Sequence, residues 1–228
     1  MKIYFYPGLG ADSFLARFHS IPGFDIQWIG WPRVFGDTWE DFIRNIKSEN
    51  RIENNAIHAG ISFGGLVAQR MACDFEAEGV ILIGSLSSGN AIAGIFRMMR
   101  AFVRFIPAPL FSIRLMPRFL IRYYFGIRKR AELDLFYAMA RKLNGGKVKT
   151  LIRFIHAAER DARPGCPTLR VHGSLDRILP VGNQAVDFAV DGGGHLISMT
   201  HAEEINARVS EWLEWAAGEE NPGSRVPL

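Results

Sequence analysis

The sequence has few cysteines and no long apolar run. Only Cys73 and Cys166 occur among 228 residues, and neither lies in a Cys-x-x-Cys pair or a Cys/His cluster with metal-ligand spacing. A disulfide framework and a structural zinc site are therefore not expected. No segment reaches about 18 consecutive apolar residues, so no transmembrane helix is expected. The N-terminal apolar run ends at Pro7-Gly8, which is too short for a secretion signal, and a cytoplasmic location is predicted.

The net charge of the chain is small, but positive charge is concentrated in one segment. The composition is 48% hydrophobic and 22% charged, which is typical of a globular chain and excludes disorder. Residues 87–160 contain 15 Lys/Arg against three acids, a net charge of +12, so the rest of the chain carries −8 of the total of +4. No helix-turn-helix, zinc or RNA-module pattern accompanies this charge, so a nucleic-acid partner is not expected.

Apolar runs alternate with amphipathic stretches in both halves of the chain. Strands are expected at 2–6, 24–31, 55–61, 79–85, 168–173 and 184–190, and helices at 37–49, 64–75 and 201–217. Strands that are apolar throughout and alternate with helices predict an α/β fold, with a mostly parallel sheet covered by helices on both faces.

The segment between the two halves has a helical pattern instead. It is broken into short pieces at Pro107, Pro109, Pro117 and Gly145-Gly146. We therefore predict one α/β core formed by residues 1–86 and 161–218. A helical cap or lid is predicted at 87–160 and a flexible tail at 219–228.

A short glycine-flanked motif contains the first candidate catalytic residue. Gly60-Ile61-Ser62-Phe63-Gly64 matches G-x-S-x-G and lies between an expected strand and an expected helix. In this setting the serine occupies a strained turn that exposes its hydroxyl, and the flanking positions are too crowded for side chains. The alternative is a glycine-rich helix start that a serine caps.

A serine hydroxyl needs a histidine base, and an acid to orient that base, before it can act as a nucleophile. His195 follows three glycines after the last expected strand, and Asp176 follows strand 168–173. The chain order Ser62, Asp176, His195 is the one that this serine turn requires. All three are expected at the carboxyl ends of strands, on one edge of the sheet.

Together these motifs resemble those of the α/β-hydrolase superfamily, in particular serine esterases with a helical cap. The resemblance covers residues 2–86 and 164–217 and rests on the segments PGLG, GISFGG, HGSLDRILP and GGGH, in that order. It implies a carboxylesterase-like enzyme that needs no cofactor and no metal. It also implies an oxyanion hole formed by the backbone N–H groups of Leu9 and Phe63, although Pro7 stands where many relatives have histidine.

The resemblance also bears on the acid and on the sheet. Some relatives place the acid after the preceding strand, but residues 83–88 offer no carboxylate, which leaves Asp176; Asp187 and Asp191 are alternatives beside His195 in sequence. The first strand would correspond to the third of the family's usual eight, so a shortened sheet is expected.

Two interpretations of the basic segment stay open. In one it is a lid with a solvated arginine face and an apolar face on the core. In the other, its apolar side chains line a substrate pocket, with Phe96, Met99, Phe102, Phe119 and Tyr123 as candidates. The arginine face would then meet an anionic partner, such as an acidic carrier protein, a nucleotide-bearing thioester or an anionic lipid surface; the candidates are Arg97, Arg100 and Arg104.

Three functional hypotheses follow. The first is hydrolysis of a small-molecule carboxylic ester with an apolar acyl or alcohol group, through an acyl-enzyme on Ser62. The second is hydrolysis of acyl thioesters or carrier-bound esters, with docking through the basic segment. The third is a partner- or membrane-binding module on an inactive hydrolase scaffold. Lyase or lactonase chemistry on the same residues is a further variant, because a fold does not determine its reaction.

Overall fold

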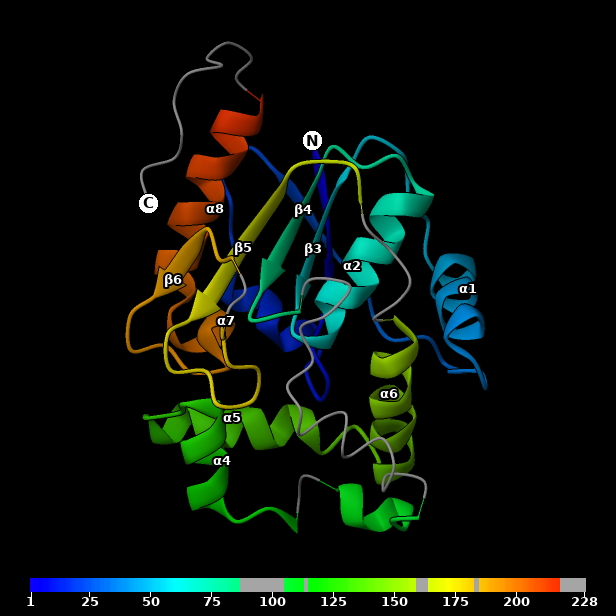
Figure 1. The fold of residues 1–228 in the computed structure, drawn as a ribbon, viewed down its shortest axis with the longest axis vertical. Coiled ribbons are helices and arrows are strands. Elements are labelled where there is room, and N and C mark those ends of the chain that lie inside the picture. Colours follow the sequence, from blue (N-terminus) through cyan, green and yellow to red (C-terminus); the bar gives the residue numbers. More distant parts are fainter. Residues whose placement is uncertain (87–104, 113–114, 159–163, 183–184, 218–228) are drawn as a thin grey trace.

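A single parallel sheet forms the centre of the molecule (Figure 1). The computed structural model describes residues 1–86, 105–112, 115–158, 164–182 and 185–217. All strand pairs are parallel, in the order β2-β1-β3-β4-β5-β6. The strands are β1 (Lys2–Tyr6), β2 (Asp25–Trp28), β3 (Ile57–Ile61), β4 (Gly79–Ile83), β5 (Thr168–Gly173) and β6 (Phe188–Val190).

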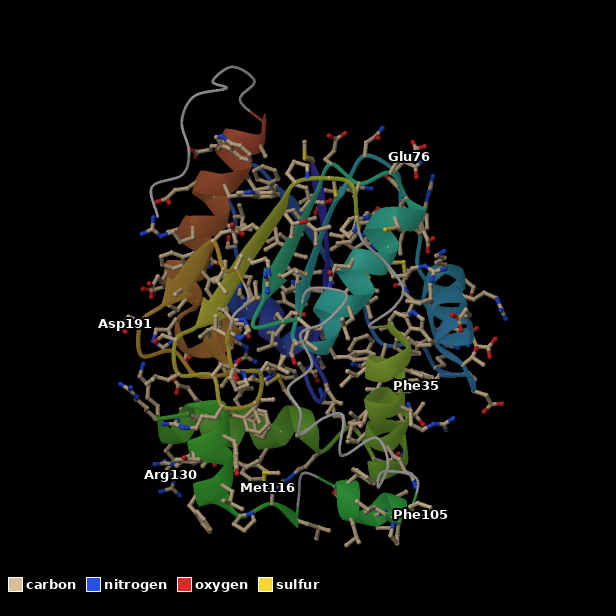
Figure 2. All side chains as sticks on the ribbon, in the orientation of Figure 1. Phe35, Glu76, Phe105, Met116, Arg130 and Asp191 are labelled. Carbon is tan, nitrogen blue, oxygen red and sulfur yellow. The ribbon has the colours of Figure 1, made fainter. Side chains whose placement is uncertain are left out.

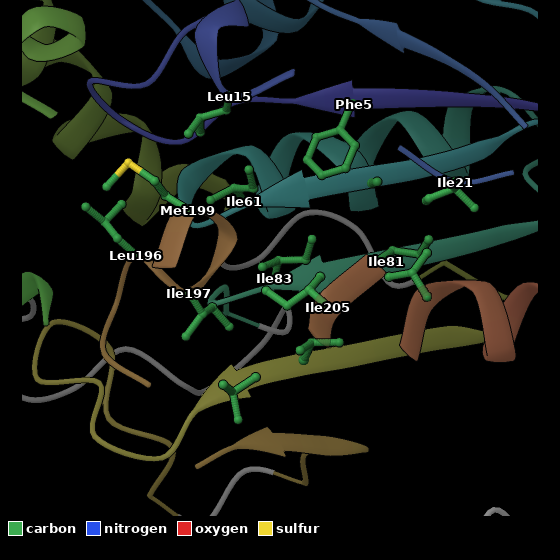
Figure 3. Packing of buried hydrophobic residues seen from close by; sticks show 14 of the residues in the cluster. Phe5, Leu15, Ile21, Ile61, Ile81, Ile83, Leu196, Ile197, Met199 and Ile205 are labelled. Carbon is green, nitrogen blue, oxygen red and sulfur yellow. The ribbon is translucent and has the colours of Figure 1, made fainter. Parts of the chain in front are cut away.

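Successive side chains of β1 pack on opposite faces of the sheet, as the two-residue period of a strand requires. Ile3 and Phe5 join one apolar cluster, and Tyr4 and Tyr6 join the other. The first cluster is covered by η1 (Ser13–Phe18), α7 (Ile197–Thr200) and α8 (Ala202–Ala217). The second is covered by α1 (Trp39–Glu49), α2 (Phe63–Asp74) and α6 (Gly145–Ala158). Figure 3 shows the packing of the first cluster. The predicted α/β fold, with helices on both faces, is thus confirmed.

A set of short helices lies between β4 and β5 in the sequence, and we call residues 105–158 the helical insertion. Its elements are η2 (Ala108–Phe111), α4 (Arg118–Phe125), α5 (Arg130–Ala140) and α6. They lie beyond the carboxyl ends of the strands (Figure 1). Pro107 and Pro117 immediately precede η2 and α4, and α6 begins at Gly145, so these three predicted breaks are element boundaries, whereas Pro109 lies inside η2. None of the described helices is both long and apolar enough to cross a membrane.

Several boundaries differ from the prediction. The strand predicted at 24–31 is shortened to β2. Of the strand predicted at 184–190, only the last three residues pair with β5, and these form β6. Helix α1 begins after Thr38 rather than at Asp37. The Thr38 side chain accepts a hydrogen bond from the Asp41 N–H, and the Asp41 carboxylate accepts one from the Thr38 N–H. This reciprocal capping box determines where the helix starts.

The strand order places one crevice next to the candidate serine. The chain first adds β2 on one side of β1 and then β3 on the other, so the winding direction changes between β1 and β3. In open α/β sheets, ligands bind beyond the carboxyl ends of the strands at such a switch point. The loop after β1 and the turn after β3 contain Leu9 and Ser62, respectively.

Candidate active site

Ser62 occupies a strained turn between β3 and α2. Its φ is +51° and its ψ is −118°, a backbone conformation that residues with a side chain rarely adopt. A Cβ atom on Gly60 would overlap the Gly64 backbone, and one on Gly64 would overlap the Tyr6 carbonyl oxygen. The glycines of the motif are therefore needed for the close approach of three backbone segments, which explains why the turn has this sequence.

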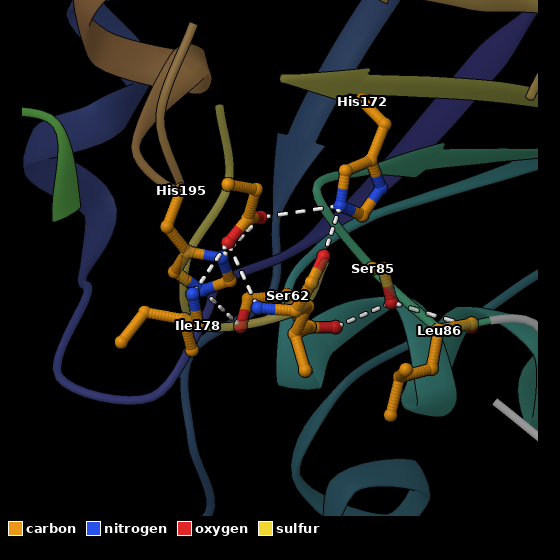
Figure 4. Close-up of polar contacts among 8 residues, drawn as sticks. Ser62, Ser85, Leu86, His172, Ile178 and His195 are labelled. Atoms are coloured by element: carbon orange, nitrogen blue, oxygen red, sulfur yellow. Dashed lines mark hydrogen bonds and ion pairs between the residues drawn. The ribbon is translucent and has the colours of Figure 1, made fainter. Parts of the chain in front are cut away.

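Ser62, His195 and Asp176 form one hydrogen-bonded chain. Figure 4 shows Ser62 and His195 side by side in this chain. The Ser62 Oγ lies 2.9 Å from His195 Nε2, and His195 Nδ1 lies 2.8 Å from Asp176 Oδ2. An ionised carboxylate can only accept, so the proton of the neutral imidazole is on Nδ1. Nε2 then has a free lone pair, and the serine hydroxyl donates to it. This geometry equips His195 to remove the proton of Ser62.

Asp176 is held by donors on both carboxylate oxygens. Oδ1 accepts the backbone N–H groups of Ile178 and Leu179, each at 2.8 Å. Oδ2 accepts from His195 and lies 3.1 Å from Nε2 of His172. Burial favours the neutral acid, but His195 and these donors outweigh it and hold the pKa of the Asp176 carboxyl well below its usual range. Asp176 therefore stays ionised beside the imidazole.

The sequence did not predict the part taken by His172, at the end of β5. Its Nε2 lies 2.7 Å from the Leu179 carbonyl oxygen as well as 3.1 Å from Asp176 Oδ2. Both neighbours are acceptors, so Nε2–H donates to both. His172 thus fixes the carboxylate and the loop that follows it. A histidine directly before the glycine that ends the strand is the sequence feature that could have indicated this role.

Ser85, just after β4, is hydrogen-bonded to the backbone of the turn that contains Ser62. Its hydroxyl donates to the Ser62 carbonyl oxygen at 2.6 Å, and the Ser62 N–H donates to the Ile83 carbonyl oxygen at 3.0 Å. A Cβ atom on Gly65 would overlap the Ser85 side chain. Ser85 stands where some relatives have the catalytic acid, and here it holds the backbone of the turn instead.

An apolar pocket of about 380 Å³ opens next to the serine. This volume lies within the usual range for small-molecule sites. The pocket lies between the sheet edge and the helical insertion, and one charged side chain, Arg177, is among its described lining residues. Its walls are Leu9, Ser62, Phe63, Leu66, Leu86, Met116, Tyr124, Phe125, Ile152, Ile155, Arg177, Ile178, Leu179 and His195.

The two backbone N–H groups assigned to the oxyanion hole flank the same space. Phe63 is the first residue of α2, where N–H groups have no acceptor within the helix. Leu9 follows Gly8, where an added Cβ would lie 3.3 Å from the Ser62 Cβ. Both Leu9 and Phe63 line the pocket with Ser62. The assignment of their N–H groups to an oxyanion hole stays a prediction.

The structure corrects the assignment of pocket residues on α4. Phe119 and Tyr123 are 69% and 56% exposed and do not line the pocket. Ile121, Tyr124 and Phe125 instead face the interior or the pocket. At about 100° per residue, Phe119 and Ile121 point to nearly opposite sides of the helix. The face of α4 predicted to line the pocket is therefore the exposed face, and the prediction for Phe119 and Tyr123 is wrong.

The other expectations for the basic segment lie outside the described residues: Phe96, Met99, Phe102, Arg97, Arg100 and Arg104. Of the alternative acids, Asp187 accepts the Arg170 backbone N–H at 2.7 Å, and Asp191 is exposed. Within the described chain, no group of His, Cys, Asp and Glu side chains could hold a metal ion.

Comparison with known proteins places this architecture in a family. The model of the alpha/beta hydrolase family matches residues 5–208, whereas comparison with curated proteins finds no match. Among solved structures, a proposed lipase (lip1) from Acinetobacter baumannii AYE has a TM-score of 0.72 at 13% identity, covering 94% of this chain and 84% of its own. MenH from S. aureus has a TM-score of 0.69 at 14% identity (96% and 95% covered). An esterase from Thermogutta terrifontis has a TM-score of 0.63 at 17% identity (96% and 91%). The chain belongs to the alpha/beta hydrolase family.

Proposed function

We propose that this protein is a serine hydrolase that cleaves carboxylic esters with an apolar acyl or alcohol group. The observation that carries the proposal is the hydrogen-bonded chain from Asp176 through His195 to Ser62, whose hydroxyl opens into an apolar pocket. A buried acid, a histidine with its proton held on Nδ1 and a serine at 2.9 Å are what acyl transfer to a hydroxyl requires.

Acylation starts when His195 Nε2 takes the Ser62 proton as Oγ attacks the ester carbonyl carbon. The carbonyl oxygen becomes an oxyanion, which accepts from the N–H groups of Phe63 and Leu9. The intermediate collapses, the bond to the alcohol oxygen breaks, and His195 gives its proton to the departing alcohol. Asp176 remains ionised throughout and stabilises the imidazolium.

Deacylation repeats these steps with water. His195 Nε2 takes a proton from water as its oxygen attacks the acyl carbon on Ser62. The second tetrahedral intermediate releases the carboxylic acid, and the proton returns to Ser62 Oγ. The net reaction consumes one ester and one water and yields one acid and one alcohol.

The pocket supports the choice of an apolar substrate group. Leu66, Leu86, Ile152 and Ile155 offer hydrocarbon surface close to the serine. Burying hydrocarbon against such surfaces contributes about 25 cal/mol per Å² removed from water. An ester whose acyl chain fills the pocket should therefore have a lower KM than the corresponding acetate ester.

The direct test is hydrolysis of p-nitrophenyl butyrate by Ser62→Ala, with Ser48→Ala as the control. Ser48 lies on α1, and its hydroxyl bonds only locally, to the Asn45 carbonyl oxygen at 3.0 Å. Loss of the nucleophile should lower kcat by about 10³-fold or more. The Ser48 variant should keep the parent rate. Equal rates for a folded Ser62→Ala protein and the parent would refute the proposal.

A second candidate reaction is hydrolysis of anionic acyl thioesters. Arg177 at the pocket and the +12 charge of residues 87–160 favour it. Replacing Arg97, Arg100 and Arg104 with Glu should then slow hydrolysis of butyryl-CoA or a carrier-bound acyl group while p-nitrophenyl butyrate is still cleaved normally. Equal loss on both substrates would count against this candidate. The intact hydrogen-bonded chain argues against an inactive scaffold.

A further inference from the structure

Large apolar side chains are exposed along the end of the helical insertion that faces away from the sheet. We call Phe105, Leu110, Leu115 and Phe119 the apolar edge. Their exposed fractions are 72%, 63%, 63% and 69%. Figure 2 shows Phe105 and Met116 at this end of the molecule, opposite α8. Apolar side chains that gather at one exposed end indicate a surface that meets another apolar phase or partner.

Cationic side chains border the apolar edge. An open groove of about 600 Å³ is lined by Leu115, Met116, Pro117, Arg118, Tyr137 and Arg141. The Arg118 guanidinium lies over the Tyr137 ring at 5.8 Å and is 62% exposed as a side chain. Apolar side chains and guanidinium groups thus line the same groove.

The charge of the described residues is polarised in the same direction. The described part of the insertion carries a net charge of +8, and the other described residues carry −7. In the field of an anionic surface, this separation turns the insertion toward the surface and the core away from it. Within the described insertion, Glu132 and Asp134 are the acids, and both form ion pairs with cations of the insertion itself.

The apolar edge also leads toward the catalytic pocket. Met116 lines both the groove and the pocket beside Ser62. Tyr124, on α4 with Phe119, is 40% exposed and lines the same pocket. Met116 and Tyr124 therefore connect the apolar edge with the pocket beside Ser62.

We propose that the apolar edge and its bordering arginines dock the protein on an anionic lipid surface. Such a surface supplies anionic headgroups and hydrocarbon at neighbouring depths, which matches the groove and the edge. Self-association through this face would bring two positively charged insertions together, each with a net charge of +8 over its described residues, and charge repulsion opposes this. The patch of an acidic protein would match the arginines but not four exposed apolar side chains.

Sedimentation with vesicles tests this docking. Phosphatidylcholine vesicles and equimolar phosphatidylcholine–phosphatidylglycerol vesicles are compared, with the parent protein, Leu115→Ser/Phe119→Ser and Trp215→Ser. Trp215 is a matched control because it is a large apolar side chain, 48% exposed, on α8 at the other end of the molecule. The parent and Trp215→Ser should bind the anionic vesicles, and the double variant should bind at least about tenfold more weakly.

A charge variant and a catalytic variant complete the experiment. Arg118→Gln/Arg141→Gln should weaken binding to anionic vesicles several-fold and reduce its dependence on salt. Ser62→Ala should bind as the parent does, so failure of the proposed reaction and failure of docking are distinguishable. The Leu115→Ser/Phe119→Ser protein should keep the parent rate on soluble p-nitrophenyl butyrate.

Several results would overturn the proposal. One is a parent protein that stays in the supernatant with anionic vesicles. Another is binding that Leu115→Ser/Phe119→Ser and Trp215→Ser weaken equally. A dimer that dissociates in the Leu115→Ser/Phe119→Ser variant, without vesicle binding, would assign the edge to a second copy. Binding of an acidic acyl carrier protein but not of vesicles would assign it to a protein partner.

Discussion

The Asp176 carboxylate receives four hydrogen bonds, and only one of them comes from His195. The two backbone donors fix Oδ1, while Oδ2 is shared between the imidazoles of His195 and His172. Because the direction of Oδ2 sets the plane of the His195 ring, His172, which is not among the described lining residues of the pocket, influences how Nε2 faces Ser62. We therefore regard His172 as a positioning residue.

Replacing His172 with Leu should lower kcat by about 10- to 100-fold with little change in KM. The reason is that a lost hydrogen bond to a charged group costs about 1.5–3 kcal/mol. His172→Gln, which retains an N–H donor, should recover part of the rate. The measurement is steady-state kinetics on p-nitrophenyl butyrate, with thermal melting in parallel. If Leu and Gln lower kcat equally, in step with stability, the role of His172 is structural only.

At this scale the sequence predicts candidate residues from the types that the chemistry requires. Ser62, Asp176 and His195 follow particular strands in the order that a nucleophile, an acid and a base need, and the structure brings the three side chains into one hydrogen-bonded chain. Ser85 and His172 were not predicted to act at the site. Their contacts join the ends of different strands, and such contacts depend on the strand order rather than on neighbouring sequence.

Among the elements of the insertion, α4 packs on the loop that contains His195. Gly126 caps its C-terminus with φ +72°, and an added Cβ there would lie 2.6 Å from the Gly194 Cα. The Leu196 N–H donates to the Phe125 carbonyl oxygen at 3.2 Å, and the Phe125 ring lies 5.9 Å from the His195 ring. Two facing glycines thus allow the insertion to pack directly on the histidine loop.

Gly126→Ala should therefore separate α4 from this loop. Gly23→Ala is the matched control, since Gly23 has φ +81° and no atom within 4 Å of an added Cβ. Both variants incur backbone strain of about 1 kcal/mol. Only Gly126→Ala adds the overlap, and its free energy of unfolding should fall by a further 1–3 kcal/mol or so. Urea denaturation compares the two, and kcat should fall for Gly126→Ala alone. Equal effects would rule out a specific α4 contact.

Element type was predictable where the apolar pattern was continuous, as in β1, β3, β4 and β5. The face of α4 was not. Phe119 and Tyr123 lie four residues apart, as do Ile121 and Phe125, so both pairs form an apolar stripe on a helix. Which stripe is buried depends on where α4 meets α5 and the histidine loop, and the sequence of α4 alone contains no information on that.

For the whole molecule, the buried His58 makes stability depend on pH. It lies fully buried in β3, where its Nδ1 is hydrogen-bonded to the Tyr6 hydroxyl at 2.9 Å, and burial lowers the pKa of His58 to about 4. In the unfolded chain it titrates near 6.5. Between these values the unfolded state binds a proton that the folded state excludes. The contribution of the neutral His58 to the free energy of unfolding is therefore fully present above pH 6.5 and is lost as the pH falls toward 4.

The free energy of unfolding should consequently drop by about 2–3 kcal/mol from pH 7 to about pH 4.5 because of His58. His58→Gln should have a shallower dependence, while burial of His19, which also lowers its pKa, leaves a residual slope in both proteins. Urea titrations at the two pH values measure the difference. Parallel curves for the parent and His58→Gln would contradict this explanation.

The central claim is that Ser62 becomes acylated because His195 removes its proton. Treatment with a fluorophosphonate probe, followed by mass spectrometry of the intact protein and its peptides, tests this directly. We expect one adduct per chain, on the peptide that contains Ser62, and at most slow labelling when His195 is replaced by Ala. An unlabelled folded parent protein, or an adduct on another residue with Ser62 free, would contradict it.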